Sequence, residues 1–303
     1  MRQNSFRFVC LLFGLSFLGG EMKAQQKSAH ETGLRSKSTS ELAELEQVIT
    51  KVNYDESKVP VYTLPDVLTL TNGRKVTTKK EWVEKRRPEL LRLFETQIYG
   101  KAPVRSKDLH FRLLNEDREA LGGLATRKEV AVYLTKDEKH YLTVLMYLPN
   151  RRKGTVPMFF GINFKGNHAI HPDEGITFPS EERMIAYGRK RMFPRGSAAS
   201  RWPVEMLMEH GYGLATFYRG DIDPDFDDGF QNGVHPLYYK KGQTRPAEDE
   251  WGTLAAWAWG MSCAMDYFET DKDIDAKRIA IFGHSRLGKT TLWAGAIDPR
   301  FAL

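Results

Sequence analysis

The seven residues GHSRLGK at positions 283–289 place a serine where a nucleophile is useful. An apolar run, RIAIF (278–282), comes before them, and a helix-forming run, TTLWAGA (290–296), follows. A sharp turn from a strand into a helix exposes a serine hydroxyl beside backbone N–H groups that can bind an oxyanion. The sequence therefore predicts that Ser285 is a nucleophile, and the alternative is a serine that caps the helix.

A serine hydroxyl needs a base to take its proton. All eight histidines, at positions 30, 110, 140, 168, 171, 210, 235 and 284, precede Ser285, whereas hydrolases with this elbow have acid and histidine after the serine. The side chain of His284 is expected to point away from Ser285. His168 follows a buried strand and is expected at the rim of the site or in its oxyanion loop, or else to order its own loop. Asp298, in the turn DPR, is expected to end a helix rather than to serve as the triad acid.

Composition indicates one globular α/β domain, because 303 residues with 41% hydrophobic and 28% charged residues suffice for a sizeable core. The net charge is +6, but the basic residues are scattered, and the one dense run, KRRPELLR (85–92), is predicted to be a solvated helix face. We therefore expect no nucleic-acid partner.

No metal or cofactor is expected. The Asp-rich stretch DIDPDFDDG (221–229) lacks the glycine and glutamate spacing of a calcium loop, and we predict a rigid loop whose aspartates cap turns. The sequence contains no Gly-rich phosphate loop, dinucleotide fingerprint or zinc spacing.

The N-terminus has the features of a signal peptide over residues 1–24. Arginines flank an apolar run, FVCLLFGLSFLGG (8–20), that is too short to span a bilayer. We expect export to the periplasm or the exterior, a polar linker with a short helix over 25–58, and the catalytic domain over 59–303. Removal of the signal would leave Cys263 as the single cysteine, so no internal disulfide and no membrane span are expected.

The elements that must position Ser285 follow from hydrophobic patterning. Residues 59–70 favour an extended edge segment, residues 79–100 favour a helix that ends at Gly100, and two runs around a Gly-Gly turn predict a hairpin. Apolar strands then alternate with helices, which indicates an α/β sheet with parallel strands at its centre. The predicted strands cover 109–115, 125–135, 141–149, 156–164, 212–218 and 278–283, and the later helices cover 204–211, 248–268 and 285–297.

Tryptophans in this pattern have two expected roles. Trp251, Trp257 and Trp259 lie at helical spacing among apolar residues and are expected in the core. Trp202, in a long irregular segment from about 165 to 201, is a better candidate for stacking against a sugar.

The elbow and several longer blocks resemble the glucuronoyl esterases, carbohydrate esterase family 15 (4-O-methyl-glucuronoyl methylesterases), in their bacterial branch. In that family the elbow is Gly-x-Ser-Arg-x-Gly-Lys, which accounts for the position of Gly288. The resemblance covers roughly residues 60–303 and implies an α/β-hydrolase fold, a three-layer sandwich. The blocks that carry it are GINFKGNHA (161–169), RWPVE (201–205), GDIDPDFDDGFQNGVHP (220–236), EWGTLAAWAWGMS (250–262) and DIDAKRIAIFGHSRLGKTTLWAGA (273–296).

The resemblance also implies roles for residues of this chain. Ser285 would attack an ester of glucuronic acid in glucuronoxylan or in a lignin–carbohydrate complex and form an acyl-enzyme. Arg286 would bind the oxyanion, and Lys289 would hydrogen-bond sugar hydroxyls. His168 and Trp202 are further candidates for contacts with the substrate.

Two alternatives remain open from the sequence. The chain is a serine esterase of another specificity, such as an acetylxylan esterase, or it is not a working enzyme as given. The family's acid and histidine lie beyond the position that corresponds to Leu303, so the resemblance implies a C-terminally truncated, incomplete domain without these two triad members. We expect a monomer.

Overall fold

The computed structural model describes residues 53–136, 138–186 and 192–303. The predicted signal peptide and nearly all of the predicted linker lie outside the described residues. The chain divides into two compact units, Met1–Pro65 and Asp66–Leu303. In the first unit the described residues form one short 3₁₀ helix, η1 (Glu56–Lys58), whose first turn is capped by the carboxylate of Asp55.

The extended segment predicted over residues 59–70 forms no regular strand. Its pairing is limited to one antiparallel bridge between Thr69 and Lys75. The carboxylate of Asp66 binds the backbone N–H of Leu68 and the hydroxyl of Thr69, so this part of the chain is held as a turn.

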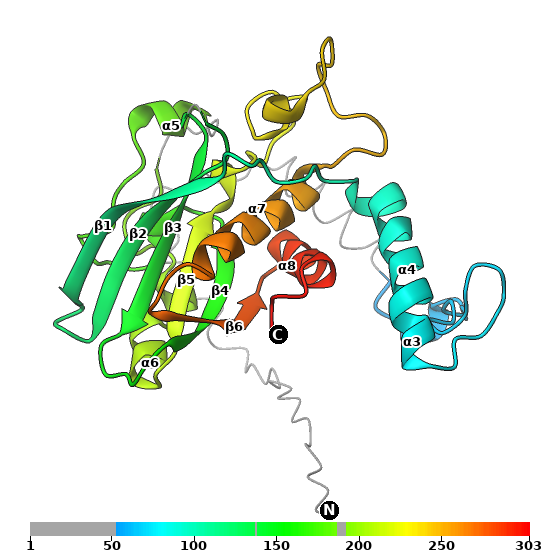
Figure 1. Cartoon of the computed structure of the whole chain (residues 1–303), viewed down its shortest axis with the longest axis horizontal. Helices are drawn as coiled ribbons and strands as arrows, with labels where there is room; N and C mark the ends of the chain where they lie inside the picture. The colour runs from blue at the N-terminus through cyan, green and yellow to red at the C-terminus, as the bar shows by residue number, and fades with distance from the viewer. Residues whose placement is uncertain (1–52, 137, 187–191) are drawn as a thin grey trace, which may run out of the picture. The chain divides into compact units, whose positions relative to one another are not determined.

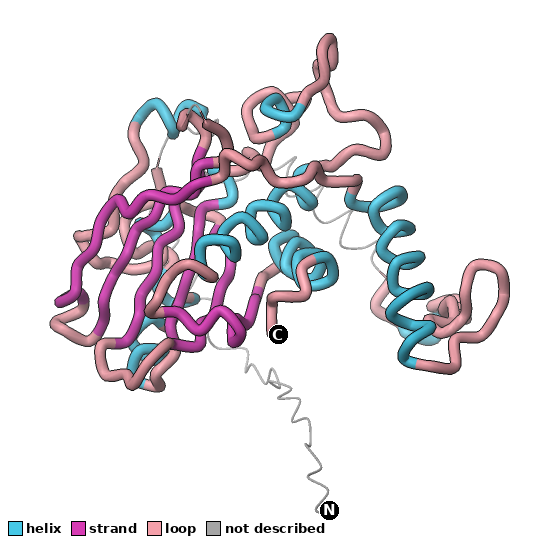
Figure 2. Tube along the Cα trace, in the orientation of Figure 1, coloured by secondary structure: helices cyan, strands magenta, loops and turns pink. Residues whose placement is uncertain are grey.

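The second unit is built on a six-stranded mixed sheet, with strand order β1-β2-β3-β5-β4-β6 among the described residues (Figures 1 and 2). The first three strands form an antiparallel meander, as the predicted hairpin required, and β3 is antiparallel to β5. Strand β4 pairs in parallel with both β5 and β6, so the carboxyl ends of these three strands lie at one edge of the sheet. The strands are β1 (His110–Ala120), β2 (Ala125–Tyr133), β3 (Tyr141–Pro149), β4 (Val156–Asn163), β5 (Gly213–Tyr218) and β6 (Ile274–Phe282).

The loops after parallel strands are where α/β proteins bind ligands. After β4 the chain returns to form β5, between β3 and β4, and then crosses to form β6 on the other side of β4. The loops after β4 and β6 therefore leave neighbouring strands at the same edge, and Ser285 lies in the second of them.

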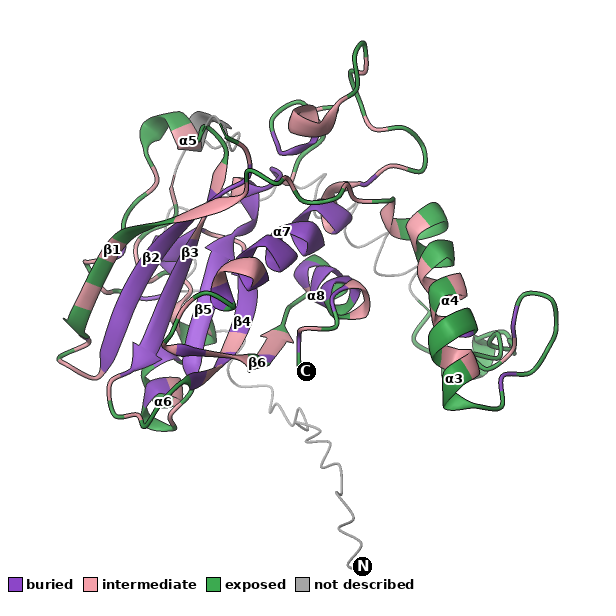
Figure 3. Cartoon of the chain, in the orientation of Figure 1, coloured by how far each residue is buried: buried purple, intermediate pink, exposed green. Residues whose placement is uncertain are grey.

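Helices cover both faces of the sheet, and the two-residue period of the strands explains the two cores. On one face Val144 and Met146 of β3 belong to the cluster that packs under α7 (Thr253–Phe268) and α8 (Arg286–Ile297). On the other face Leu145 and Tyr147 pack with α6 (Val204–Glu209). Figure 3 shows β2 to β5 and the inner side of α7 as buried. The described part of the loop after β4 contains α5 (Glu181–Ala186) and the short 3₁₀ helices η4 (Asn167–Ala169) and η5 (Ala199–Arg201).

The three tryptophans predicted to lie in the core do so, because Trp251, Trp257 and Trp259 are 4%, 0% and 3% exposed. The indole N–H of Trp257 donates to the carbonyl oxygen of Asp223, and that of Trp259 donates to Pro103. Buried indoles with satisfied N–H groups pack as structural residues, and they form no sugar platform.

The helix predicted over residues 79–100 is continuous but irregular. It alternates α-helical and wider π-helical turns, and Pro88 is the second residue of its longest α-helical part, directly after the π-helical turn η2. Gly100 ends it at φ 78°, and a Cβ there would lie 2.2 Å from the carbonyl oxygen of Glu250, so only glycine fits. The parts are α3 (Lys79–Glu81), η2 (Trp82–Arg86), α4 (Arg87–Phe94) and η3 (Glu95–Tyr99).

No helix within the described ranges is both long enough and apolar enough to cross a bilayer.

Candidate active site

Ser285 lies in a strained elbow between β6 and α8. Its backbone has φ 55° and ψ −128°, a conformation that few non-glycine residues adopt. The residue is exposed, and although it stands at the N-cap position of α8, its side chain makes no capping hydrogen bond. The alternative of a capping serine therefore does not describe its geometry, and the hydroxyl is presented to solvent at the start of the helix.

Close packing between β6 and α8 makes this elbow possible. A Cβ on Gly283 would lie 2.3 Å from the carbonyl oxygen of Leu287 and 2.5 Å from the hydroxyl of Thr291. A Cβ on Gly288 would lie 3.3 Å from the carbonyl oxygen of Gly283. Both glycines therefore allow β6 and α8 to approach closely. This explains why a glycine at position 288 is useful, although the common Gly-x-Ser-x-Gly pattern would place it at position 287.

The first N–H groups of α8 lie at this elbow, where a helix has donors without intrahelical partners. The first helical residue is Arg286, directly after Ser285. The carbonyl oxygen of Ser285 already accepts from the N–H groups of Gly288 and Lys289, so the helix is fixed relative to the serine. Such an arrangement can bind the negative charge that develops on a carbonyl oxygen attacked by Ser285.

A cavity of about 680 Å³ opens beside the elbow. Its lining comes from the end of β4 and the loop after it, from the segment before α6, and from the residues that precede Ser285. It contains two lysine or arginine side chains and no carboxylate. The lining residues are Ile162, Asn163, Phe164, Lys165, Ile170, Ser197, Ala198, Ser200, Arg201, Trp202, Phe282, Gly283 and His284.

Trp202, predicted to stack against a sugar, is part of this lining. Its ring meets Phe282 edge-on, with the ring centroids 5.5 Å apart and the planes at 62°. The ring is partly exposed. On the other side of the cavity His284 meets Phe164 edge-on at 6.4 Å. The structure thus brings Trp202 to the neighbourhood of Ser285, although 83 residues separate them in the sequence.

Arg286, predicted to bind the oxyanion, forms an ion pair that the sequence did not predict. Its Nη1 lies 2.6 Å and 2.7 Å from the two carboxylate oxygens of Asp225. Arg219 approaches the same carboxylate, with its Nη2 3.2 Å from Oδ2. The crowding of aspartates in 221–229 was the only signal in the sequence, and it does not say which aspartate meets which arginine.

The other aspartates of the 221–229 loop hold the loop, as predicted. Asp223 accepts from the hydroxyl of Thr253, and its carboxylate lies 3.2 Å from the buried imidazole of His235. Asp227 and Asp228 accept from backbone N–H groups two to four residues further on. Among the residues that the structure describes, no cluster of side chains has the composition of a metal site.

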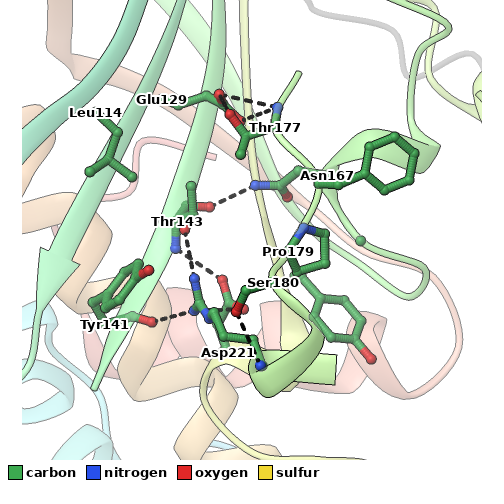
Figure 4. Close-up of a pocket in the computed structure, with 13 residues that line it drawn as sticks. Leu114, Glu129, Tyr141, Thr143, Asn167, Thr177, Pro179, Ser180 and Asp221 are labelled. Atoms are coloured by element: carbon green, nitrogen blue, oxygen red, sulfur yellow. Dashed lines mark hydrogen bonds and ion pairs between the residues drawn. The ribbon is translucent and has the colours of Figure 1, made fainter. Parts of the chain in front are cut away.

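A second, smaller cavity of about 240 Å³ lies under the loop after β4 (Figure 4). Its polar groups bind one another. The backbone N–H of Thr143 donates to Asp221, the amide of Asn167 donates to the carbonyl oxygen of Thr143, and Thr177 donates to Glu129. These bonds tie the loop after β4 and the segment after β5 to β2 and β3.

Lys289 is exposed and follows Ser285 by four residues, one helical turn. No ion pair with any described residue engages its ammonium group. His168, in contrast, is only 2% exposed. Its ring stacks on Phe178 at 4.4 Å, and its Nε2 lies 3.0 Å from the carbonyl oxygen of Phe193. This placement, outside the lining of the cavity, favours the alternative that His168 orders its own loop.

The described residues bring no Ser-His-acid triad together. The two buried histidines that face a carboxylate, His171 with Glu205 and His235 with Asp223, are absent from the cavity lining at the elbow. Asp298 is where the sequence predicted it, at the C-terminal end of α8, and both of its carboxylate oxygens bind Arg300. It therefore lies a helix length from Ser285, about 18 Å.

Comparisons with known proteins agree with this geometry. A curated carbohydrate esterase, MZ0003 from an unknown prokaryotic organism, is 51% identical over 258 residues, which cover 83% of this chain. A solved structure described as a promiscuous CE15 esterase from the marine bacterial metagenome is 50% identical, with a TM-score of 0.70, over 82% of this chain and 64% of that one. The chain belongs to carbohydrate esterase family 15.

Within family 15, a glucuronoyl esterase from Solibacter usitatus is 45% identical, with a TM-score of 0.76, over 81% of this chain and 63% of that chain. The sequence family described as "Glucuronyl esterase, fungi" matches residues 206–303. The predicted family and the predicted α/β-hydrolase fold are therefore confirmed. The chain spans 59% of the length of the curated relative MZ0003.

Proposed function

We propose that Ser285 is the nucleophile of a serine esterase that cleaves esters of glucuronic acid in glucuronoxylan or lignin–carbohydrate complexes. The observation that carries the proposal is Ser285, exposed at φ 55° at the start of α8 with its hydroxyl uncapped. A conformation of this kind costs about 1–3 kcal/mol and persists where the surroundings enforce it, often at an active site. Membership of family 15 gives the ester class.

The reaction has two stages, formation of an acyl-enzyme and its hydrolysis. Ser285 Oγ bonds to the ester carbonyl carbon while a base takes its proton, and the carbonyl oxygen becomes the oxyanion. The bond to the alcohol then breaks, the alcohol leaves with a proton, and water later hydrolyses the glucuronoyl-enzyme. The backbone N–H and the guanidinium of Arg286 are the donors for the oxyanion. The proton acceptor is not among the residues that the described part of the chain brings to Ser285.

The two halves of the substrate have different surroundings. Lys289, which is exposed on the first turn of α8, would donate hydrogen bonds to hydroxyl groups of the uronate. Trp202, Phe164 and Phe282 give the cavity beside the elbow aromatic walls that suit a sugar ring or an aryl alcohol. His168 supports this region by fixing the loop after β4.

Hydrolysis of benzyl glucuronate by the protein expressed from its complete reading frame tests the proposal. We expect Ser285→Ala to lower kcat about 10³-fold or more, because the remaining groups bind but do not attack. Ser57→Ala, which changes an exposed serine far from α8 in the sequence, serves as the control and should not alter the rate. A wild-type protein without activity on the ester, or a Ser285→Ala variant as fast as wild type, would overturn the proposal.

A second candidate is a broader esterase, because the similar enzyme from the marine bacterial metagenome is described as promiscuous. Rates on benzyl glucuronate and on acetylated xylan separate the two, since Arg286 and Lys289 suit a substrate with a uronate. A ratio of kcat/KM near one would favour the broader enzyme.

Export is part of the same proposal, because a polysaccharide substrate lies outside the cell. N-terminal sequencing of protein recovered from the periplasm or the medium tests the predicted signal over residues 1–24. A mature chain that still begins at residue 1 would contradict it.

A further inference from the structure

Two arginines share one carboxylate beside the nucleophile. Asp225 receives Nη1 of Arg286 on both oxygens, at 2.6 Å and 2.7 Å, and Nη2 of Arg219 on Oδ2, at 3.2 Å. The side chain of Asp225 is 20% exposed, whereas that of Arg286 is 53% exposed. A half-exposed arginine at the end of a helix normally samples several rotamers, and the bond to a less exposed carboxylate restricts it to one.

Contacts with the buried side of the 221–229 loop fix the carboxylate of Asp225. The side chain of Arg219 is 11% exposed, and its guanidinium lies 5.5 Å from the ring centroid of Trp257, which is in the core. Two residues before Asp225, the side chain of Asp223 binds Thr253, the first residue of α7, and its carbonyl oxygen accepts from the indole of Trp257. Asp225 is therefore fixed to the rigid α7 layer, while Arg286 begins the separate helix α8.

Charge balance distinguishes this group from a simple ion pair. Arg286 and Asp225 alone would be neutral, and a neutral pair stabilises an oxyanion poorly. Arg219 adds a second positive charge, so the three side chains together carry a charge of +1. The pair also uses only Nη1 of Arg286. Its other N–H groups make no hydrogen bond with any described residue, and they remain available to a ligand.

We propose that Asp225, supported by Arg219, is the positioning residue of the oxyanion site, and that it holds the guanidinium of Arg286 beside Ser285. This inference rests on the proposed esterase function. It assigns to one aspartate of the 221–229 loop a role beyond holding that loop. Asp225 does not itself touch the substrate, and it acts through Arg286 alone.

Kinetics on benzyl glucuronate provide the first test. We expect Asp225→Asn to lower kcat about 10- to 100-fold with KM changed less than about threefold, since misplacing an oxyanion donor affects the transition state more than the bound ester. Asp225→Glu, which restores the carboxylate, should recover part of the loss. In an Arg286→Ala background, Asp225→Asn should cost nothing further, because the residue through which it acts is gone.

The matched control is Asp275→Asn. Asp275 also pairs with an arginine, Arg278, and its side chain is 21% exposed, but it lies at the other end of β6 from Ser285. This variant should keep the wild-type kcat. If Asp225→Asn were as active as wild type, or more active because Asp225 withholds Arg286 from the site, the inference would be overturned.

A second measurement does not depend on activity. Phenylglyoxal modifies arginines in their uncharged form, so an arginine held by a carboxylate reacts slowly. Mass spectrometry should show Arg286 modified severalfold faster in Asp225→Asn than in wild type, with the rate at Arg278 unchanged. The reverse pattern is expected for Asp275→Asn. Equal rates at Arg286 in wild type and Asp225→Asn would refute the positioning role even if no glucuronate ester were cleaved, whereas a wholly inactive wild type refutes the esterase function.

Discussion

Thr291 donates a hydrogen bond from its hydroxyl to the carbonyl oxygen of Phe282, 3.1 Å away, and so ties the second turn of α8 to the last residue of β6. The same hydroxyl lies 2.8 Å from the carbonyl oxygen of Leu287. The two bonds span the elbow that contains Ser285. They require the strand end and the helix to approach closely, and Gly283 permits that approach.

A methyl group at position 283 should therefore destroy the elbow. In Gly283→Ala the new Cβ would lie 2.3 Å from a backbone oxygen that cannot move without shifting α8. We expect the free energy of unfolding in urea to fall by about 2 kcal/mol or more and the esterase activity to be lost.

Gly295→Ala is the comparison for that variant. Gly295 lies in the same helix, and its nearest neighbour would be a flexible Ile281 methyl at 3.4 Å. Alanine is favoured over glycine in a helix by about 1 kcal/mol, so this variant should be neutral or stabilising. If both alanines cost the same, the close approach at Gly283 is not what shapes the elbow.

The strain at Ser285 predicts a difference between two inactive variants. Glycine adopts φ 55°, ψ −128° at less cost than alanine does, so Ser285→Gly should unfold at a higher urea concentration than Ser285→Ala. We expect a difference of about 1 kcal/mol in favour of glycine. Equal stabilities, measured with equal slopes against urea, would mean that the backbone at residue 285 relaxes in solution.

Much of the fold was predictable because its signals are local. The near-continuous apolar run at 156–164 predicted a strand buried on both faces, and six of the eight residues of β4 are buried. The Gly-Gly turn predicted the hairpin of β1 and β2, and the stripe from Leu254 to Phe268 predicted α7. The predicted extended segment 59–70 forms no regular strand, and its only strand-like pairing among the described residues is the bridge between Thr69 and Lys75.

The candidate site was predictable only in part, for a physical reason. The strand, the glycine and the serine of the elbow are adjacent in the sequence, so their pattern shows there. Asp225 and Arg286 are 61 residues apart, and their ion pair depends on how the 221–229 loop is bound to α7. His168 has the same limitation, since its burial under Phe178 depends on the path of a long loop.

Trp202 provides a test of the cavity as a binding site. We expect Trp202→Ala to raise KM for benzyl glucuronate about tenfold, because an aromatic wall beside Ser285 is lost, with a smaller change in kcat. Tyr212→Ala is the control, since Tyr212 forms a similar aromatic pair with Phe159, at 5.4 Å and 58°, at the opposite edge of the sheet. An unchanged KM in Trp202→Ala would remove this residue from the proposed binding site.

A buried ion-pair network far from Ser285 predicts how stability depends on pH. Lys128, 7% exposed, donates to both oxygens of Asp271 and to Asp273, and the hydroxyl of Tyr267 also donates to Asp271. These contacts connect β2 to the segment between α7 and β6. Burial by itself would raise the pKa of Asp271, but the hydrogen bonds from Lys128 and Tyr267 outweigh it and hold the pKa below its usual value.

A carboxyl group whose pKa is lower in the folded state stabilises the fold above its unfolded pKa, about 3.9, and loses that contribution as the pH falls through the folded value. Asp271→Asn should therefore lower the free energy of unfolding by about 3 kcal/mol at pH 7, because it leaves Lys128 buried without its main partner. The difference from wild type should shrink below about pH 4. Urea unfolding at pH 7, 5 and 3 measures it. Asp275→Asn, which removes an exposed pair, should change stability by less than about 0.5 kcal/mol at pH 7. A gap between wild type and Asp271→Asn that stayed constant from pH 7 to pH 3 would show that lost packing, and not the charge of Asp271, causes the effect.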